Sequence, residues 1–194
     1  MRAELAPRRR GRRPPGSVAV LAAGALIMAA TMVTGCAALR DTVPGCGDPL
    51  RMAIIAQSVP AAAYIPCIRQ LPQGWSSSAF DPGNGGTRFA LNSDRAPGAP
   101  VTVQLAARCR VDGAPPTQPR ADGVRTYEHL TSTSPRTAGT LYDVFPGGCI
   151  SYRFSFVLGP SIELIQQFES AVGLYSRQQL RQDLKRKLGV ELTS

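Results

Sequence analysis

The stretch Ile150-Ser151-Tyr152-Arg153-Phe154-Ser155-Phe156-Val157-Leu158 decides the fold class, because apolar and polar side chains alternate along most of it. Successive side chains of a β-strand point to opposite faces, so a period of two predicts a strand with one buried face. A second alternating run, residues 101–109, predicts another half-buried strand. Weaker alternation predicts further strands at 87–92, 125–132 and 140–145.

Three segments have helical features instead. Asp48 and Ser176 are typical N-cap residues, Pro49 suits a first helical position, and Gly189 suits a helix end. We expect helices at 49–58, from residue 161 along an apolar stripe that reaches Tyr175, and at 177–188. The sequence therefore predicts an α+β domain with an antiparallel sheet of about four or five strands, packed against two or three helices.

The first 35 of the 194 residues differ in composition from the rest. They hold six arginines and one glutamate, and residues 17–33 carry no charge. A basic segment followed by a short apolar run is typical of a signal peptide, and 17 residues fall below the roughly 20 of a spanning helix. We expect residues 1–35 to be removed during export. Twin-arginine export stays open, although Pro14 and Pro15 do not fit its usual motif.

The apolar run ends in Val33-Thr34-Gly35-Cys36, which resembles the lipobox of bacterial lipoproteins. In that motif the cysteine thiol takes a diacylglyceryl group, whose buried methylenes contribute about 0.8 kcal/mol each. We therefore expect Cys36 to anchor the chain at the extracytoplasmic face of the cell membrane. Residues 36–47 would form a short tether and residues 48–194 a single domain. An ordinary signal peptide, or an uncleaved anchor with an incidental cysteine, is the alternative.

The remaining cysteines are Cys46, Cys67, Cys109 and Cys149, an even number in an oxidising compartment, which predicts two disulfides. Three pairings are open, and we favour Cys46–Cys67 and Cys109–Cys149. The facing of the side chains argues against the second pair. Cys109 lies on the core face of its run, whereas Cys149 precedes Ile150 and so lies on the face opposite the core. No C-x-x-C spacing is present, so we expect neither a metal site nor a cofactor.

Outside the first 35 residues the net charge is +4, and the segment 177–187 accounts for all of it. This balance argues against nucleic-acid binding. Arg181 and Lys185, four residues apart beside a leucine seam, are candidate contacts to anionic headgroups or to an anionic envelope polymer. The plainer interpretation is that cations near a helix C-terminus stabilise the helix dipole.

His129 is the single histidine, so a catalytic triad would have to use it, but no Gly-x-Ser-x-Gly elbow is present. Asp94 and Asp143 are a candidate carboxylate pair, or simply a turn and a polar strand position. Trp75 and Tyr64 lie in a proline-rich segment and are candidate ligand contacts, or else fill one end of the core.

Segments 58–75, 91–96 and 144–154 resemble a family of uncharacterised exported proteins and lipoproteins of high-GC Gram-positive bacteria. The resemblance would cover roughly residues 46–190. It implies an intact extracytoplasmic domain and assigns no chemistry. We expect a non-catalytic accessory or binding module of the cell envelope, with an envelope protein or anionic polymer as partner; the alternative is a small cell-envelope hydrolase that uses His129.

Overall fold

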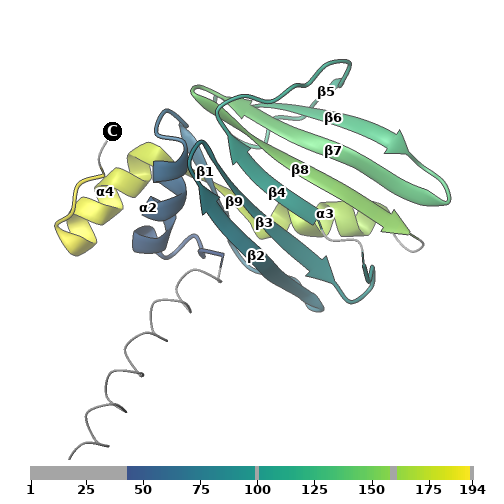
Figure 1. Cartoon of the computed structure of the whole chain (residues 1–194), viewed down its shortest axis with the longest axis horizontal. Coiled ribbons are helices and arrows are strands. Elements are labelled where there is room, and N and C mark those ends of the chain that lie inside the picture. The colour runs from purple at the N-terminus through teal and green to yellow at the C-terminus, as the bar shows by residue number, and fades with distance from the viewer. Residues whose placement is uncertain (1–42, 99–100, 158–160, 193–194) are drawn as a thin grey trace, which may run out of the picture. The chain divides into compact units, whose positions relative to one another are not determined.

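The computed structural model describes residues 43–98, 101–157 and 161–192. This part of the chain has an α+β fold with a seven-stranded sheet, a two-stranded ribbon and three helices (Figure 1). In chain order the elements are α2 (Pro49–Ser58), β1 (Tyr64–Ile68), β2 (Trp75–Gly83), β3 (Gly86–Ser93), β4 (Val101–Ala106), β5 (Pro116–Thr117), β6 (Arg125–Ser132), β7 (Arg136–Phe145), β8 (Gly148–Val157), α3 (Ser161–Ala171), β9 (Val172–Ser176) and α4 (Arg177–Leu188).

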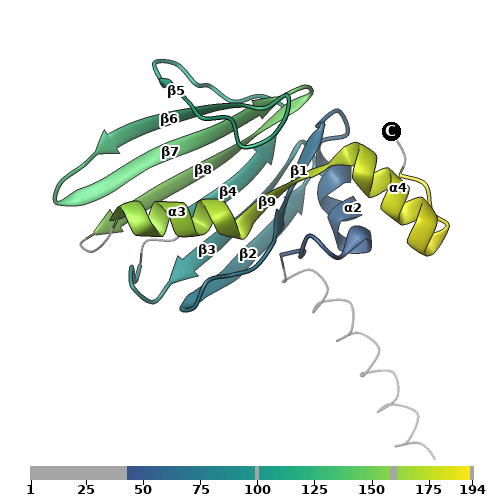
Figure 2. The same ribbon diagram turned by 180° about the vertical axis from the view of Figure 1, so that it is seen from behind.

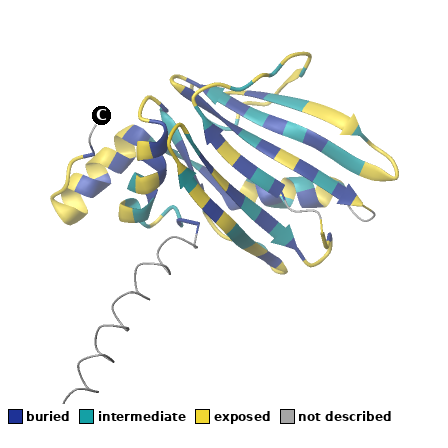
Figure 3. Ribbon diagram, in the orientation of Figure 1, coloured by how far each residue is buried: buried dark blue, intermediate teal, exposed yellow. Residues whose placement is uncertain are grey.

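The large sheet has the strand order β2-β3-β4-β8-β7-β6-β5, and every neighbouring pair is antiparallel. In β8 the residues Ile150, Tyr152, Phe154 and Phe156 are buried on what we call the inner face. Alternate residues point to the opposite, outer face, and the resulting bands of burial are visible in Figure 3. The alternating stretch thus forms a central strand, as predicted.

Helix α3 covers part of the inner face, and Figure 2 looks onto it from that side. The Phe168 ring lies 5.6 Å from that of Phe154, 6.1 Å from Tyr152 and 6.5 Å from Phe156, measured between centroids. These four aromatic side chains are buried and form the centre of the core. None of the helices in the described part of the chain lies on the outer face (Figure 1).

The predicted helix boundaries at α2 and α4 are confirmed. Asp48 accepts a hydrogen bond from the backbone N–H of Arg51 at 3.1 Å, and Ser176 accepts one from Gln179 at 3.1 Å. Gly189 ends α4 with φ 65°, a left-handed conformation that glycine adopts without a Cβ clash.

Arg177 joins these two helices. It begins α4, and its buried guanidinium donates to the carbonyls of Ala56, Val59 and Ala62 at 2.5, 2.8 and 2.7 Å. These carbonyls lie at and just beyond the C-terminus of α2, where the backbone lacks intrahelical donors and the helix dipole favours a cation. Arg177 therefore caps α2 from a different helix.

The prediction that the helix after residue 160 reaches Tyr175 is wrong. Helix α3 ends at Ala171, and residues 172–176 form β9, which pairs with β1 from Tyr64↔Ser176 to Ile68↔Val172. A Cβ at Gly173 would lie 2.9 Å from the Sγ of Cys46, so this close packing requires glycine. Tertiary pairing with β1 outweighs the helical spacing of the apolar residues.

The predicted number of strands is too low. The five expected strands are present as β3, β4, β6, β7 and β8, but the structure also contains β1, β2, β5 and β9. β2 carries three serines and a bulge between Ser78 and Asp81 at an edge of the sheet, so it shows no clean alternation. It returns to β3 through Asn84-Gly85, the two-residue turn typical of β-hairpins.

Both favoured disulfides are present. Cys46–Cys67 and Cys109–Cys149 have Cα–Cα separations of 5.0 and 6.0 Å. The apparent conflict over the facing of Cys109 is resolved because β4 ends at Ala106, before the cysteine. The chain has left the sheet there and is free to approach Cys149 on the outer side.

Part of the expected tether belongs to the fold. Val43 is buried, the backbone N–H of Cys46 donates to the Ile68 carbonyl at 2.9 Å, and the Ile68 N–H donates to the Pro44 carbonyl at 2.9 Å. Residues 43–47 are therefore held against β1.

Candidate functional site

The segment that carries the predicted signal peptide and lipidation site lies outside the described residues. This applies to residues 1–35 and to Cys36. Within the described ranges, no helix has the length and apolar character needed to cross a membrane.

His129 lies on β6, exposed, and pairs with Thr140 across the outer face. Within the described part of the chain its imidazole makes no hydrogen bond or ion pair, so no serine or carboxylate is positioned to form a triad with it. Asp94 is exposed after β3, whereas Asp143 is fully buried in β7. No observation therefore favours the hydrolase hypothesis.

The two candidate aromatic contacts make structural contacts. Trp75 is buried, and its indole N–H donates to Gln167 of α3 at 2.7 Å. Tyr64 is half-buried, donates to the Asp122 carbonyl at 2.6 Å and packs edge-on against Phe145 at 5.5 Å. These contacts fit the alternative that both rings fill and fasten the core.

Arg181 and Lys185 are exposed on α4, as the helical spacing predicts. They line a shallow hollow of about 300 Å³ together with Glu191 and Leu192. Lys185 lies 3.4 Å from the Glu191 carboxylate, so part of its charge is compensated. Contact with an anionic surface through these two residues stays a prediction.

The largest hollow among those at the inner face lies between α3 and the β6–β7 end of the sheet, and we call it the α3 groove. It encloses about 950 Å³. Its lining residues are Glu128, Leu130, Thr133, Thr137, Ser161, Ile162, Glu163, Ile165, Gln166 and Glu169. The groove exists because α3 is shorter than the strands it covers. The eleven residues of α3 span about 16 Å, whereas the ten-residue strands β7 and β8 span about 33 Å. The helix therefore leaves part of the inner face uncovered.

Apolar side chains are exposed in this groove. Ile162 is 74% exposed and Leu130 is 45% exposed, and both are large aliphatic residues with water on one side. Gly139, opposite Leu130 in β7, allows close packing there, since a Cβ would lie 2.6 Å from the His129 carbonyl oxygen and 3.1 Å from Leu130 Cδ2. Exposed aliphatic side chains that share one hollow mark it as a binding site.

Two carboxylates stand at the inner end of the groove. Glu128 comes from β6 and Glu169 from the last turn of α3, and both also line a smaller neighbouring hollow of about 310 Å³. Burial raises the pKa of Glu169 above its ordinary value; the nearby charge of Arg120 opposes this rise, and those of Glu128 and Asp143 add to it. A cation placed between Glu128 and Glu169 would relieve this repulsion.

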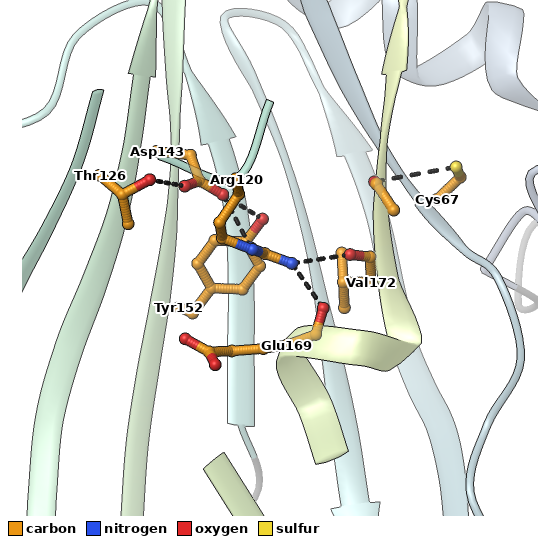
Figure 4. A network of polar contacts seen from close by, with 8 residues as sticks. Cys67, Arg120, Thr126, Asp143, Tyr152, Glu169 and Val172 are labelled. Atoms are coloured by element: carbon orange, nitrogen blue, oxygen red, sulfur yellow. Dashed lines mark hydrogen bonds and ion pairs between the residues drawn. The ribbon is translucent and has the colours of Figure 1, made fainter. Parts of the chain in front are cut away.

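A buried polar network fixes the position of α3 beside this groove (Figure 4). Asp143, with no exposed surface, accepts hydrogen bonds from Arg120 at 2.8 Å, from Thr126 at 2.9 Å and from Tyr152 at 2.9 Å. Burial raises the pKa of Tyr152 above its ordinary value, and although Arg120 opposes this, the Asp143 carboxylate adds to it. The phenol therefore keeps its proton and acts as a donor.

The second terminal nitrogen of Arg120 extends the network to the helix. It donates to the carbonyls of Glu169 and Val172 at 2.5 and 2.9 Å, where α3 ends and β9 begins. The guanidinium also lies 5.0 Å from the centroid of the Tyr152 ring, a cation–π distance. Arg120 therefore links the 107–124 loop, the sheet and α3, and it compensates the buried Asp143 charge.

The groove presents both aliphatic and acidic side chains. Its polar groups are carboxylates, an amide and hydroxyls, and in the described ranges no group of three or more His, Cys, Asp or Glu residues is placed to hold a metal. The acidic end and the aliphatic walls match a ligand that has an apolar body and a cationic group.

No sequence motif marks the residues of the groove and of the buried network. Arg120 lies in a proline-rich loop without periodicity, so nothing in the sequence links it to Asp143. Two signals were available: Glu128 falls on an inward-pointing position of a predicted strand, and Ile162 falls outside the apolar stripe of its helix.

The chain matches no protein-family model, no curated protein and no solved structure. Its function is therefore argued from the site itself.

Proposed function

We propose that this protein is a lipid-anchored, non-catalytic binding module of the cell envelope, and that the α3 groove binds a ligand with an apolar body and a cationic group. The observation that carries the ligand proposal is the combination, in one hollow of about 950 Å³, of exposed Ile162 and Leu130 with the carboxylates Glu128 and Glu169. The anchor proposal rests on the lipobox-like sequence that ends at Cys36 and on the signal-peptide features before it. The likeness to exported proteins and lipoproteins of high-GC Gram-positive bacteria agrees with the anchor proposal.

Each part of the ligand has a physical reason. Burying an aliphatic side chain removes apolar surface from water at about 25 cal/mol per Å², so Ile162 and Leu130 favour an apolar body. A cation near Glu169 stabilises its charged form, which burial otherwise disfavours. An anionic ligand would instead add to the repulsion between Glu128 and Glu169.

The anchor is tested by the intact mass of the membrane-extracted protein, before and after reduction. We expect the mass of a chain that begins at Cys36 plus a diacylglyceryl group, with four hydrogens gained on reduction of the two disulfides. Cys36→Ala should release the protein or trap its precursor. If that variant were still processed and membrane-bound, the anchor proposal would fail.

The groove is tested with the full chain in discs of zwitterionic lipid and two short probe peptides. One probe alternates leucine with lysine, and the other alternates leucine with glutamate. Binding of the lysine peptide should shift the fluorescence of Trp75, because its indole contacts Gln167 on α3. The glutamate peptide should not bind.

Matched variants separate the groove from the rest of the surface. Glu128→Gln and Ile162→Ser should each weaken binding about fivefold, the effect of roughly 1 kcal/mol. Glu191→Gln and Leu188→Ser remove the same kinds of side chain from exposed positions in or just after α4, and they should leave the affinity unchanged. Equal losses in both pairs, or equal binding of the glutamate peptide, would refute the groove as the site.

A further inference from the structure

The outer face of the seven-stranded sheet carries a charge opposite to that of the α3 groove. Four arginines point to this face: Arg88, Arg125, Arg136 and Arg153. The strand register shows this, because Arg153 alternates with the buried residues of β8, and the other three align across the strands with outward-pointing positions of β8. All four are exposed. Asp81 is the one acidic residue on this face within the described strands, so the face has a clear positive excess.

A hollow of about 440 Å³ lies in this face, and we call it the outer-face hollow. Its polar lining consists of Arg88, Arg153, Gln104, Thr102 and Ser151, together with one carboxylate, that of Asp81. The β2 bulge shapes one side of it, where Ala79 adopts φ 54° and Phe80 is buried. Guanidinium, amide and hydroxyl groups are all hydrogen-bond donors, which is the set that recognises phosphate and carboxylate oxygens.

The arginines of this hollow are available to a ligand. Arg88 lies 3.6 Å from Asp81, but both side chains are more than 60% exposed, at 62% and 66%. An exposed pair of this kind contributes about 0–1 kcal/mol and is readily exchanged. Arg153 has no carboxylate partner in the described part of the chain, and its backbone neighbours across the sheet are Thr102 and Thr140.

The arginines are also arranged in a line. From a strand spacing of about 4.8 Å and a rise of about 3.3 Å per residue, the Cα atoms of Arg88 and Arg153 are about 12 Å apart, and those of Arg153 and Arg136 about 14 Å. The three therefore run diagonally across four strands, from β3 to β7. An extended polymer with regularly spaced anions would meet all three, whereas a small anion would meet at most the two in the hollow.

We propose that the outer face of the sheet binds a linear anionic polymer, with its phosphate or carboxylate groups held by Arg88, Arg153 and Arg136. This site is separate from the α3 groove, and it does not depend on the ligand or the anchor proposed above. It also assigns polymer binding to a surface other than α4, where the sequence placed it.

The test uses the full chain in non-ionic detergent and measures affinity for inorganic polyphosphate and for polygalacturonate, with dextran as the neutral reference. Arg153→Gln and Arg136→Gln should each weaken binding of the preferred polymer about fivefold, and the double variant about 25-fold. Added salt should weaken wild-type binding and reduce the difference in affinity between wild type and the arginine variants. The tighter of the two polymers identifies the anion.

The control is the double variant Arg181→Gln and Lys187→Gln, which removes the same charge from exposed positions of α4. It should stay within twofold of wild type. Two results would overturn the proposal: no binding of either polymer, or an equal or larger loss in the α4 variant.

Discussion

Replacing Arg120 by methionine should be among the most damaging single changes in the described fold. The substitution keeps an unbranched side chain but removes the positive charge beside Asp143, whose side chain is 0% exposed, while that of Arg120 is 16% exposed. Removing one partner of a buried ion pair costs about 3–5 kcal/mol, because the other charge stays buried without compensation. The carbonyls of Glu169 and Val172 also lose their donor. A domain of this size has a total stability of roughly 5–15 kcal/mol, so Arg120→Met should be folded but marginal.

The pair is measured by a double-mutant cycle with Asp143→Asn. Each single variant should lose about 3–5 kcal/mol, and the double variant only slightly more than either, which gives a coupling of at least about 2 kcal/mol. Urea unfolding of the full chain, followed by the fluorescence of Trp75, supplies the free energies of unfolding. Additive losses would show that the two charges do not interact in the folded protein, and would refute the reasoning.

A matched cycle isolates the effect of burial. Arg95 and Glu163 are separated by 3.0 Å, close to the 2.8 Å between Arg120 and Asp143, but their side chains are 38% and 51% exposed. Arg95→Met with Glu163→Gln should therefore couple by only about 0.2–1 kcal/mol. Similar coupling in the two cycles would contradict the claim that burial, rather than distance, sets the strength of the pair.

Three further outcomes are expected. Because burial raises the pKa of Glu169, the wild-type protein is most stable relative to Glu169→Gln below about pH 4, and this relative stability falls as the pH rises. In thermal melts, the free energy of unfolding of the variant should therefore rise relative to that of wild type by less than about 1 kcal/mol between about pH 4 and about pH 7. A difference in stability that is constant with pH would contradict this. Arg177→Met removes the guanidinium donor from three main-chain carbonyls, of which only that of Val59 has a second donor shown, the Ala62 N–H, and should lower the free energy of unfolding by about 2–4 kcal/mol. Arg181→Met on the exposed side of α4 should change it by less than about 0.5 kcal/mol. Replacing Cys109 and Cys149 by serine opens a loop of 40 residues and should lower the free energy of unfolding in urea by about 4 kcal/mol. A loss below about 1 kcal/mol would contradict this.

The sequence predicted those parts of the fold in which local pattern and tertiary environment agree. β8 and β4 lie in the middle of the sheet with one face buried, so their alternation is clear. α2 and α4 begin at residues whose side chains cap them directly, so their starts could be read from Asp48 and Ser176. In these elements the physical cause acts within a few residues.

The missed elements depend on contacts between distant parts of the chain. β1 and β9 are each five residues long and pair only with one another in the strand ladder, across more than a hundred residues. No local pattern distinguishes Val172–Ser176 from the last turn of a helix. The capping of α2 by Arg177 and the pairing of Arg120 with Asp143 are hidden for the same reason.

The alternation of apolar and polar residues is weak in β6, and this weakness has a structural cause. Its inward-pointing residues are Thr126, Glu128 and Leu130, and a carboxylate at an inward position of a covered strand would be costly. The position is tolerated because α3 is too short to cover the whole inner face, so Glu128 lies at a hollow instead of in the core. An inward-pointing charge therefore needs either a solvated hollow, as at Glu128, or buried partners, as at Asp143. By the same reasoning, the arginines that alternate with the core residues of β8 and its neighbours mark the outer face as open, and one sheet presents an acidic groove on one side and a basic surface on the other.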